Sequence, residues 1–304
     1  MRVEPRRLAI LSSLVAALLV ASCGGASRTG GPVDGQKSKQ PQRIISLSPS
    51  TTEVLWGVGA FQRVVAVSDY DDFPPEVKNL PHIGGWSNTN LEQVASLKPD
   101  LVVLTQSQAP MIKDRLDALG VPVLVVPSYT LADALSSITQ IGAAVGAEDA
   151  ARKLREETQT KLDDVRAATQ NLPRPRVLCV VDRVPGTLRG LYTATKGSFL
   201  VELIEIAGGD SIAPAAAGGF GQIGKEAIAT LDPDVIIDMA QQSTNDSKLS
   251  EDPREVWSEL REVKAVRDGR VYSLRDTSVL HPSQRVADTA RKFAEMLHPE
   301  AFKK

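Results

Sequence analysis

The stretch that decides the fold is Gly84–Val103, which reads GGWSNTNLEQVASLKPDLVV. A related stretch, GGFGQIGKEAIATLDPDVII, begins 134 residues later at Gly218. The two align without a gap, seven of the twenty positions are identical, and most others are conservative exchanges such as Trp86 for Phe220. Solenoid repeats have periods of about 20 to 50 residues, whereas this offset is the size of a whole domain. The chain is therefore expected to contain two duplicated lobes.

Apolar runs and helical patterns alternate on both sides of each repeat. In the first half, strands are expected at residues 43–47, 64–67, 101–104 and 123–126, with helices at 50–56, 91–96, 111–119 and from Leu131 on. In the second half, strands are expected at 177–181, 235–237 and 271–274, with helices at 198–207, 256–260 and 283–297. Ser50 and Glu53 have capping-box spacing at the start of the first helix. Because the apolar strands lack strict alternation, the sequence predicts an α/β fold with a parallel sheet in each lobe.

A long helix is expected between the two lobes. Residues 147–170 contain no glycine or proline, and a few apolar side chains recur among charged ones. Two prolines at residues 173 and 175 then stop the helix. We therefore expect an N-terminal lobe at 43–146, a linking helix at 147–171 and a C-terminal lobe at 174–304, with a ligand cleft between the lobes. A linking helix acts as a semi-rigid strut, so large hinge closure is not expected.

The first 22 residues have the composition of a secretory signal. Arg2, Arg6 and Arg7 precede an apolar run at 8–20, and Cys23 follows shortly after that run. The run is shorter than the roughly 20 residues of a membrane-spanning helix, and the cysteine makes the segment resemble a bacterial lipobox. The resemblance implies cleavage before Cys23 and a lipid anchor on its sulfur, on the extracytoplasmic side of a membrane. The alternative is an ordinary signal with a chance cysteine.

The composition after the signal excludes several classes of partner. Residues 23–42 are rich in Gly, Ser, Lys, Gln and Pro, so they are expected to form a flexible tether. Cys179 lies inside an apolar strand and is expected to be a buried small hydrophobe without a disulfide partner. The net charge is −2, from 35 basic and 37 acidic residues. The mature part has no strong basic block, which argues against nucleic acid as a partner.

The sequence contains no recognisable catalytic motif. Its three histidines, His82, His281 and His298, are scattered, with no HExxH motif and no Cys/His cluster for a metal. It has no GxSxG motif and no Walker A loop, and residues 218–221 do not open a long helix after a strand, as a dinucleotide fingerprint would. The chain is therefore not expected to be an enzyme, to hold a metal with its own side chains or to need a cofactor.

Three aromatic residues fall outside any core periodicity. Tyr70, Trp86 and Phe220 are expected in loops, among Asp, Ser, Asn and Gly residues. Loops at strand ends are where α/β proteins keep ligand contacts, and aromatic rings supply a large and rigid contact area. We therefore predict that these rings line a ligand site. The alternative is that each ring packs beneath its own loop.

Glu92 and Glu226 occupy equivalent positions in the two repeats. Thr89 and Glu92 have capping-box spacing, which would give Glu92 a purely local role. The same explanation fails at Glu226, because Ile223 three positions earlier has no side-chain oxygen. The helix dipole favours both carboxylates only weakly. Two exposed acids, one on each lobe, would also suit docking onto a basic partner with two-fold symmetry.

Together these residues resemble a known family, the two-lobed substrate-binding proteins of bacterial ABC importers for vitamin B12, haem and ferric siderophores. The similarity covers roughly residues 43–297 and is carried by residues 43–53, 68–75 and 91–102. The family's fold has two α/β lobes joined by one long helix, with the ligand between them. The resemblance implies that Glu92 and Glu226 pair with arginines of a membrane permease, which works with an ATPase.

Within that family the chain is most similar to the cobalamin-binding branch. This resemblance implies that Tyr70, Trp86 and Phe220 pack against a corrinoid and that Asp276 is an acidic contact. Thr277, however, replaces the aromatic residue that usually follows this acid. The expected function is capture of a corrinoid, such as cobalamin, and its unaltered delivery to an ABC permease.

Other ligands and functions compete with this interpretation. The haem branch has an iron-ligating tyrosine where this chain has Phe73, which lacks an oxygen. Siderophore binders use several arginines for an anionic ligand, and four candidates here are Arg183, Arg189, Arg275 and Arg285. His281 is either an axial ligand to cobalt or a loop residue hydrogen-bonded to backbone. A sensor or a corrinoid-handling enzyme that reuses the fold is the competitor from another class.

Overall fold

The structure is a computed structural model that describes residues 40–215, 219–240 and 252–303. The expected signal, Cys23 and most of the expected tether lie outside these ranges, so what was predicted for them stays a prediction. Within the described ranges, no helix combines the length and the apolar character that crossing a membrane requires.

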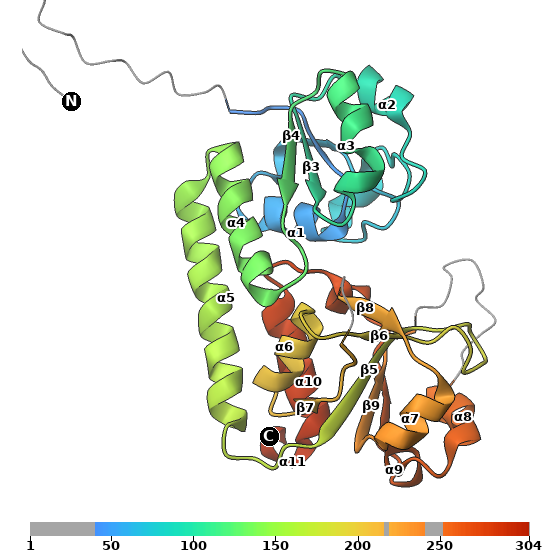
Figure 1. The fold of residues 1–304 in the computed structure, drawn as a ribbon. Coiled ribbons are helices and arrows are strands. Elements are labelled where there is room, and N and C mark those ends of the chain that lie inside the picture. The colour runs from blue at the N-terminus through green and yellow to red at the C-terminus, as the bar shows by residue number, and fades with distance from the viewer. Residues whose placement is uncertain (1–39, 216–218, 241–251, 304) are drawn as a thin grey trace, which may run out of the picture. The chain divides into compact units, whose positions relative to one another are not determined.

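The first half of the chain builds a four-stranded parallel sheet (Figure 1). Its strands are β1 (Ile44–Ser46), β2 (Val64–Ala66), β3 (Leu101–Thr105) and β4 (Val123–Val126), in the spatial order β2-β1-β3-β4. The helices are α1 (Pro49–Gly57), α2 (Leu91–Ser96), α3 (Ala109–Ala118) and α4 (Leu131–Val145), with the 3-10 helices η1 (Phe61–Arg63) and η2 (Pro75–Asn79).

Both faces of this first sheet are covered. On one face, apolar side chains of β1 and β3, among them Ile44 and Val103, join a buried cluster with α1 and α4. On the other face, Ile45 and Val102 join a second cluster with α2 and α3. Burial on both faces explains why the strands carry continuous apolar runs, as predicted.

A single long helix, α5 (Glu148–Thr169), follows α4. Its 22 residues give it a length of about 33 Å. Near its start, Ala151 belongs to the buried cluster of α1 and α4. Further along, Leu162 and Val165 belong to a cluster in the second half of the chain. The helix therefore contributes to both hydrophobic cores.

The second half builds a six-stranded mixed sheet in the order β10-β9-β5-β6-β8, with β7 paired to β5. Four of its strands pair in parallel: β5 (Arg176–Asp182), β7 (Asp210–Ser211), β9 (Val235–Asp238) and β10 (Val271–Ser273). Strand β6 (Tyr192–Ala194) runs antiparallel to both of its neighbours, β5 and β8 (Phe220–Gln222). The helices are α6 (Phe199–Ile206), α7 (Lys225–Leu231), α8 (Pro253–Trp257), η3 (Ser258–Leu260), α9 (Lys264–Arg267), η4 (Thr277–Leu280), α10 (Val286–Leu297) and α11 (Pro299–Phe302).

The α/β fold class with parallel sheets is confirmed, and the second sheet adds an antiparallel ribbon that the sequence did not predict. This ribbon consists of β6 and β8. Phe220, which was expected in a loop, lies on β8. Cys179 is buried in β5 as predicted, and burial raises the pKa of its thiol to about 12.

The internal repeat is also visible in the backbone. Lys98 and Asp232, equivalent residues of the repeat, are the non-glycine residues with positive φ in the described ranges, at 48° and 41°. The carboxylate of Asp100 accepts two backbone N–H groups just before β1, at 2.7 and 2.8 Å. The equivalent Asp234 accepts the first backbone N–H of β5, at 2.8 Å. Equivalent residues thus hold equivalent strands in the two halves.

Candidate functional site

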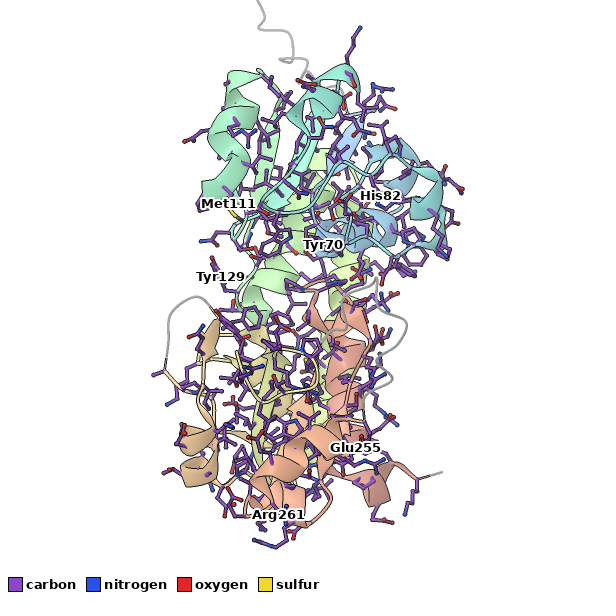
Figure 2. All side chains as sticks on the ribbon, turned by 90° about the vertical axis from the view of Figure 1, so that its right-hand side faces the viewer. Tyr70, His82, Met111, Tyr129, Glu255 and Arg261 are labelled. Atoms are coloured by element: carbon purple, nitrogen blue, oxygen red, sulfur yellow. The ribbon has the colours of Figure 1, made fainter. Side chains whose placement is uncertain are left out.

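The carboxyl ends of the first four strands lie at one edge of their sheet. Because β1 to β4 are all parallel, the segments that follow them leave the sheet on the same side. Tyr70 follows β2, Met111 lies in the first turn of α3 after β3, and Tyr129 follows β4. Figure 2 shows Tyr70 and Tyr129 toward the same end of the N-terminal half. This edge is where open α/β sheets bind ligands.

Tyr70 and Trp86 form an aromatic surface on the N-terminal half. The loops that carry them are joined by two hydrogen bonds between Asp69 and Gly84, each 3.1 Å long. A Cβ atom built on Gly85 would lie 2.8 Å from the Tyr70 ring, so that ring lies against the residue preceding Trp86. Tyr70 is 61% exposed and Trp86 is 41% exposed. Neither ring is therefore buried beneath its own loop.

The antiparallel ribbon carries a second aromatic surface, formed by Tyr192 and Phe220. Tyr192 pairs with Gln222 and Ala194 pairs with Phe220, and residues directly opposite in an antiparallel pair share a face. Both rings therefore belong to one face of the ribbon, where they are 39% and 41% exposed. The side-chain amide of Gln222 donates to the Tyr192 hydroxyl at 2.8 Å and orients that ring. Tyr192 was missed because no strand or helix was expected between residues 181 and 198.

Tyr129 links the two halves beside Phe220. Its backbone carbonyl accepts the N–H of Phe199 at 2.7 Å. Two residues further along, the backbone N–H of Leu131 donates to a side-chain oxygen of Glu202 at 3.1 Å. A Cβ atom on Gly219 would lie 3.8 Å from the Tyr129 ring. A ring from the first half is thus close to the start of β8, and it is a further candidate contact that the sequence did not single out.

Asp276 has a structural role that accounts for both of its oxygens. One oxygen accepts the backbone N–H and the hydroxyl of Ser278, at 3.0 and 2.6 Å, and caps η4. The other oxygen pairs with Lys292. Burial disfavours the charged form, but the hydrogen bonds from Lys292 and Ser278 outweigh it and lower the pKa of Asp276 to about 2. Its ligand contact stays a prediction.

Two of the four arginines that could bind an anionic ligand are paired with buried carboxylates. Arg183 lies 2.9 Å from Asp238, and both side chains are buried. Arg285 lies 3.1 Å from the buried carboxylate of Glu53. The expected capping box at Ser50 and Glu53 is wrong, because α1 begins at Pro49 and Glu53 turns to the C-terminal half.

His281 contacts the same carboxylate. Its Nδ1 lies 2.9 Å from Oε1 of Glu53, so within the described part of the chain its side chain bonds to an acid and not to the backbone. Among the residues that the structure describes, no group of three or more His, Cys, Asp or Glu side chains could hold a metal ion.

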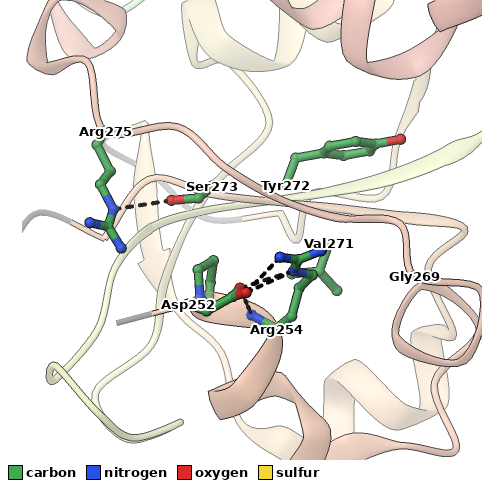
Figure 3. Close-up of a pocket in the computed structure, with 8 residues that line it drawn as sticks. Asp252, Arg254, Gly269, Val271, Tyr272, Ser273 and Arg275 are labelled. Carbon is green, nitrogen blue, oxygen red and sulfur yellow. Dashed lines mark hydrogen bonds and ion pairs between the residues drawn. The ribbon is translucent and has the colours of Figure 1, made fainter. Parts of the chain in front are cut away.

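A separate pocket of about 450 Å³ opens in the C-terminal half, between α8 and β10 (Figure 3). Its lining includes Arg254, Tyr272 and Arg275. The guanidinium of Arg254 forms an ion pair with the carboxylate of Asp252 at 2.6 Å. Nε of Arg275 lies 3.4 Å from the hydroxyl of Ser273. None of the four rings of the aromatic surfaces lines this pocket.

Glu92 and Glu226 are both exposed and both second in a short helix, α2 and α7 respectively. The capping box expected for Glu92 is wrong. The cap of α2 is Asn90, which accepts from the third residue of the helix at 3.0 Å, while the Thr89 hydroxyl donates to Gly85 at 2.9 Å. The cap of α7 is a glycine without a side-chain bond. Helix capping therefore does not explain why an acid occupies either position.

Asp71 is a buried carboxylate in the loop that carries Tyr70. Its Oδ2 accepts the backbone N–H and the hydroxyl of Ser68, at 2.9 and 2.5 Å. Its Oδ1 has no hydrogen-bond partner among the described residues. Burial raises the pKa of Asp71 to about 6, although the bonds from Ser68 act in the opposite direction.

The raised pKa of Asp71 predicts a pH-dependent stability. The folded protein holds this proton more tightly than the unfolded chain, so the stabilisation is present below about pH 4 and is lost as the pH rises through 6. The unfolding free energy of the wild type, relative to Asp71→Asn, should fall by about 1 kcal/mol between pH 5 and pH 7.5. Urea denaturation of both proteins at the two pH values measures this difference. A difference that does not change with pH would contradict the prediction.

The family model for periplasmic binding proteins matches residues 44–277. The uncharacterised ABC transporter substrate-binding lipoprotein YvrC of Bacillus subtilis (strain 168) is 32% identical over 271 residues, which cover 87% of this chain and 82% of YvrC. The vitamin B12-binding protein of Yersinia pestis (strain Pestoides F) is 28% identical over 207 residues, covering 68% of this chain and 72% of that protein.

A solved structure shows the same fold. The periplasmic haem-binding protein RhuT from Roseiflexus sp. RS-1, in its apo form, matches with a TM-score of 0.73 at 22% identity, over 86% of this chain and 99% of its own. Proteins of this kind bind solutes and are not enzymes. The match to the family model spans most of the described residues and both sheets, and the chain belongs to the periplasmic binding protein family.

Proposed function

We propose that this protein is a lipid-anchored receptor that captures a corrinoid, cobalamin in the simplest case, and delivers it to an ABC permease and its ATPase. Whatever its ligand, the chain is an extracytoplasmic substrate-binding protein of the importer class for vitamin B12, haem and siderophores. The lipid anchor is supported by Cys23 at the end of the signal and by the lipoprotein description of YvrC.

The observation that carries the ligand assignment is the pair of exposed aromatic surfaces. Tyr70 and Trp86 form one in the N-terminal half, and Tyr192 and Phe220 form the other in the C-terminal half. Rings that are exposed at the surface keep apolar area available for a partner. A corrinoid is a large, flat chelate with methyl groups around its rim, so it offers the kind of surface that such rings contact.

The competing ligands fit these residues less well. A ferric siderophore is commonly anionic, and two of the four candidate arginines, Arg183 and Arg285, already face carboxylates. Phe73, at the position of the haem-ligating tyrosine, packs edge-on against Trp56, with their ring centroids 5.0 Å apart. It has no oxygen to coordinate iron. These two observations favour a ligand held mainly by apolar contact.

The ligand assignment is tested by calorimetric titration of the mature protein with cyanocobalamin, haemin and a ferric siderophore. Tight binding is expected for cyanocobalamin alone. Trp86→Ala and Phe220→Ala should each weaken it about tenfold or more, because each removes one ring from the contact. Leu119→Ala is the control, since Leu119 is an exposed apolar residue at the opposite end of α3 from the aromatic edge. Binding of haemin or the siderophore, without heat from cyanocobalamin, would overturn the assignment.

Delivery is tested at the two exposed acids. The double variant Glu92→Gln, Glu226→Gln should leave the affinity for ligand unchanged but lower uptake about tenfold in vesicles that contain the permease and ATPase, because charge complementarity guides docking. Glu300→Gln is a matched control, since Glu300 is likewise exposed and second in a short helix, α11. Uptake equal to that of the control would show that the two acids do not dock the permease.

A further inference from the structure

Glu53 is the most deeply buried acid whose partners lie in the other half of the chain. Only 1% of its side chain is exposed, and its neighbours in α1, Val54 and Leu55, belong to the hydrophobic core. A buried carboxylate is costly unless it is paired and hydrogen-bonded. An apolar residue would serve the packing of α1 at lower cost. The presence of a charge here therefore calls for an explanation beyond packing.

All side-chain partners of Glu53 in the described residues come from one segment. Oε1 lies 2.9 Å from Nδ1 of His281 and 3.1 Å from a guanidinium nitrogen of Arg285. Oε2 accepts the hydroxyl of Ser283. The amide of Gln284 donates to the Glu53 backbone carbonyl at 2.8 Å. This segment lies about 230 residues further along the chain, so the carboxylate joins α1 to the C-terminal half.

Neighbouring contacts extend this junction to the loop that carries Tyr70. The hydroxyl of Thr277 donates to Asp72 at 2.7 Å. The guanidinium of Arg285 lies over the ring of Phe73, 4.9 Å from its centroid. Residues 275–285 therefore contact both α1 and residues 68–75. The position of Tyr70 relative to the C-terminal half depends on these contacts.

We propose that Glu53 is a positioning residue, which clasps residues 275–285 against α1 and so fixes the spacing of the two aromatic surfaces. The inference deepens the proposed function and rests on it for its consequence, retention of the ligand. Directional bonds from three donors to two oxygens define one arrangement of the segment, whereas an apolar contact would allow it to slide. Loss of the clasp loosens residues 275–285 and speeds the release of ligand.

The first readout needs no ligand. Amide hydrogen exchange of the mature protein, followed by mass spectrometry, should show residues 275–285 exchanging at least about tenfold faster in Glu53→Gln than in the wild type, with β9 and α5 unchanged. Glu202→Gln is the matched control, because Glu202 also bonds across the two halves, to Leu131, but far from this segment in sequence. Exchange that rises uniformly over the chain would reduce Glu53 to a general stability contact and overturn the proposal.

The second readout uses cyanocobalamin. Glu53→Gln should release it about tenfold faster with little change in the association rate, whereas Asp234→Asn, whose bonds to Arg176 and Lys264 lie within the C-terminal half, should not. If Glu53→Gln fails to fold, Ser283→Ala, which removes one donor only, takes its place and should show the same two effects in smaller measure. A wild type that does not bind cyanocobalamin would contradict the proposed function but leave the exchange result to decide on the clasp. Unchanged exchange in residues 275–285 would overturn the clasp whatever the ligand.

Discussion

The carboxyl ends of parallel strands lie at one edge of a sheet, and the position of the candidate contacts in the first half depends on this constraint. In the first half, the segments after β2, β3 and β4 must begin at the same edge, which gathers Tyr70, Met111 and Tyr129 there. Duplication supplies a second sheet with its own carboxyl edge, and the antiparallel ribbon beside it carries Tyr192 and Phe220. Two related sheets therefore expose rings at their margins while their apolar strands stay buried.

The chemistry of the described residues is that of a carrier. The buried carboxylates of Glu53 and Asp238 pair with Arg285 and Arg183, respectively. Each pair holds two segments of the chain together. Asp71 is buried but holds its proton up to about pH 6. The exposed rings at the candidate site bind through contact area rather than through proton transfer. A surface of this kind suits a protein that binds a solute, as members of the periplasmic binding protein family do.

Local pattern in the sequence was enough to predict the long elements and the repeat, because continuous apolar runs and a proline-free charged stretch specify strands and α5 directly. It failed at β6 and β8, which are three residues long and, unlike the equally short β1 and β2, do not lie in continuous apolar runs. The local pattern also assigned Glu53 the wrong role, that of a helix-capping residue. Because proline suits the first position of a helix, α1 begins at Pro49, and Ser50, the predicted cap, lies inside the helix. The true partners of Glu53 lie about 230 residues away, and no local pattern can show such a contact.

In the proposed complex, one ligand is contacted by rings from both halves at once. Hydroxyl-radical footprinting of the mature protein, with and without cyanocobalamin, measures the exposure of each ring directly. We expect Tyr70 and Trp86 to lose reactivity together with Tyr192 and Phe220, at the same ligand concentration, while Phe302 in α11 does not change. Protection confined to the rings of one half would contradict it.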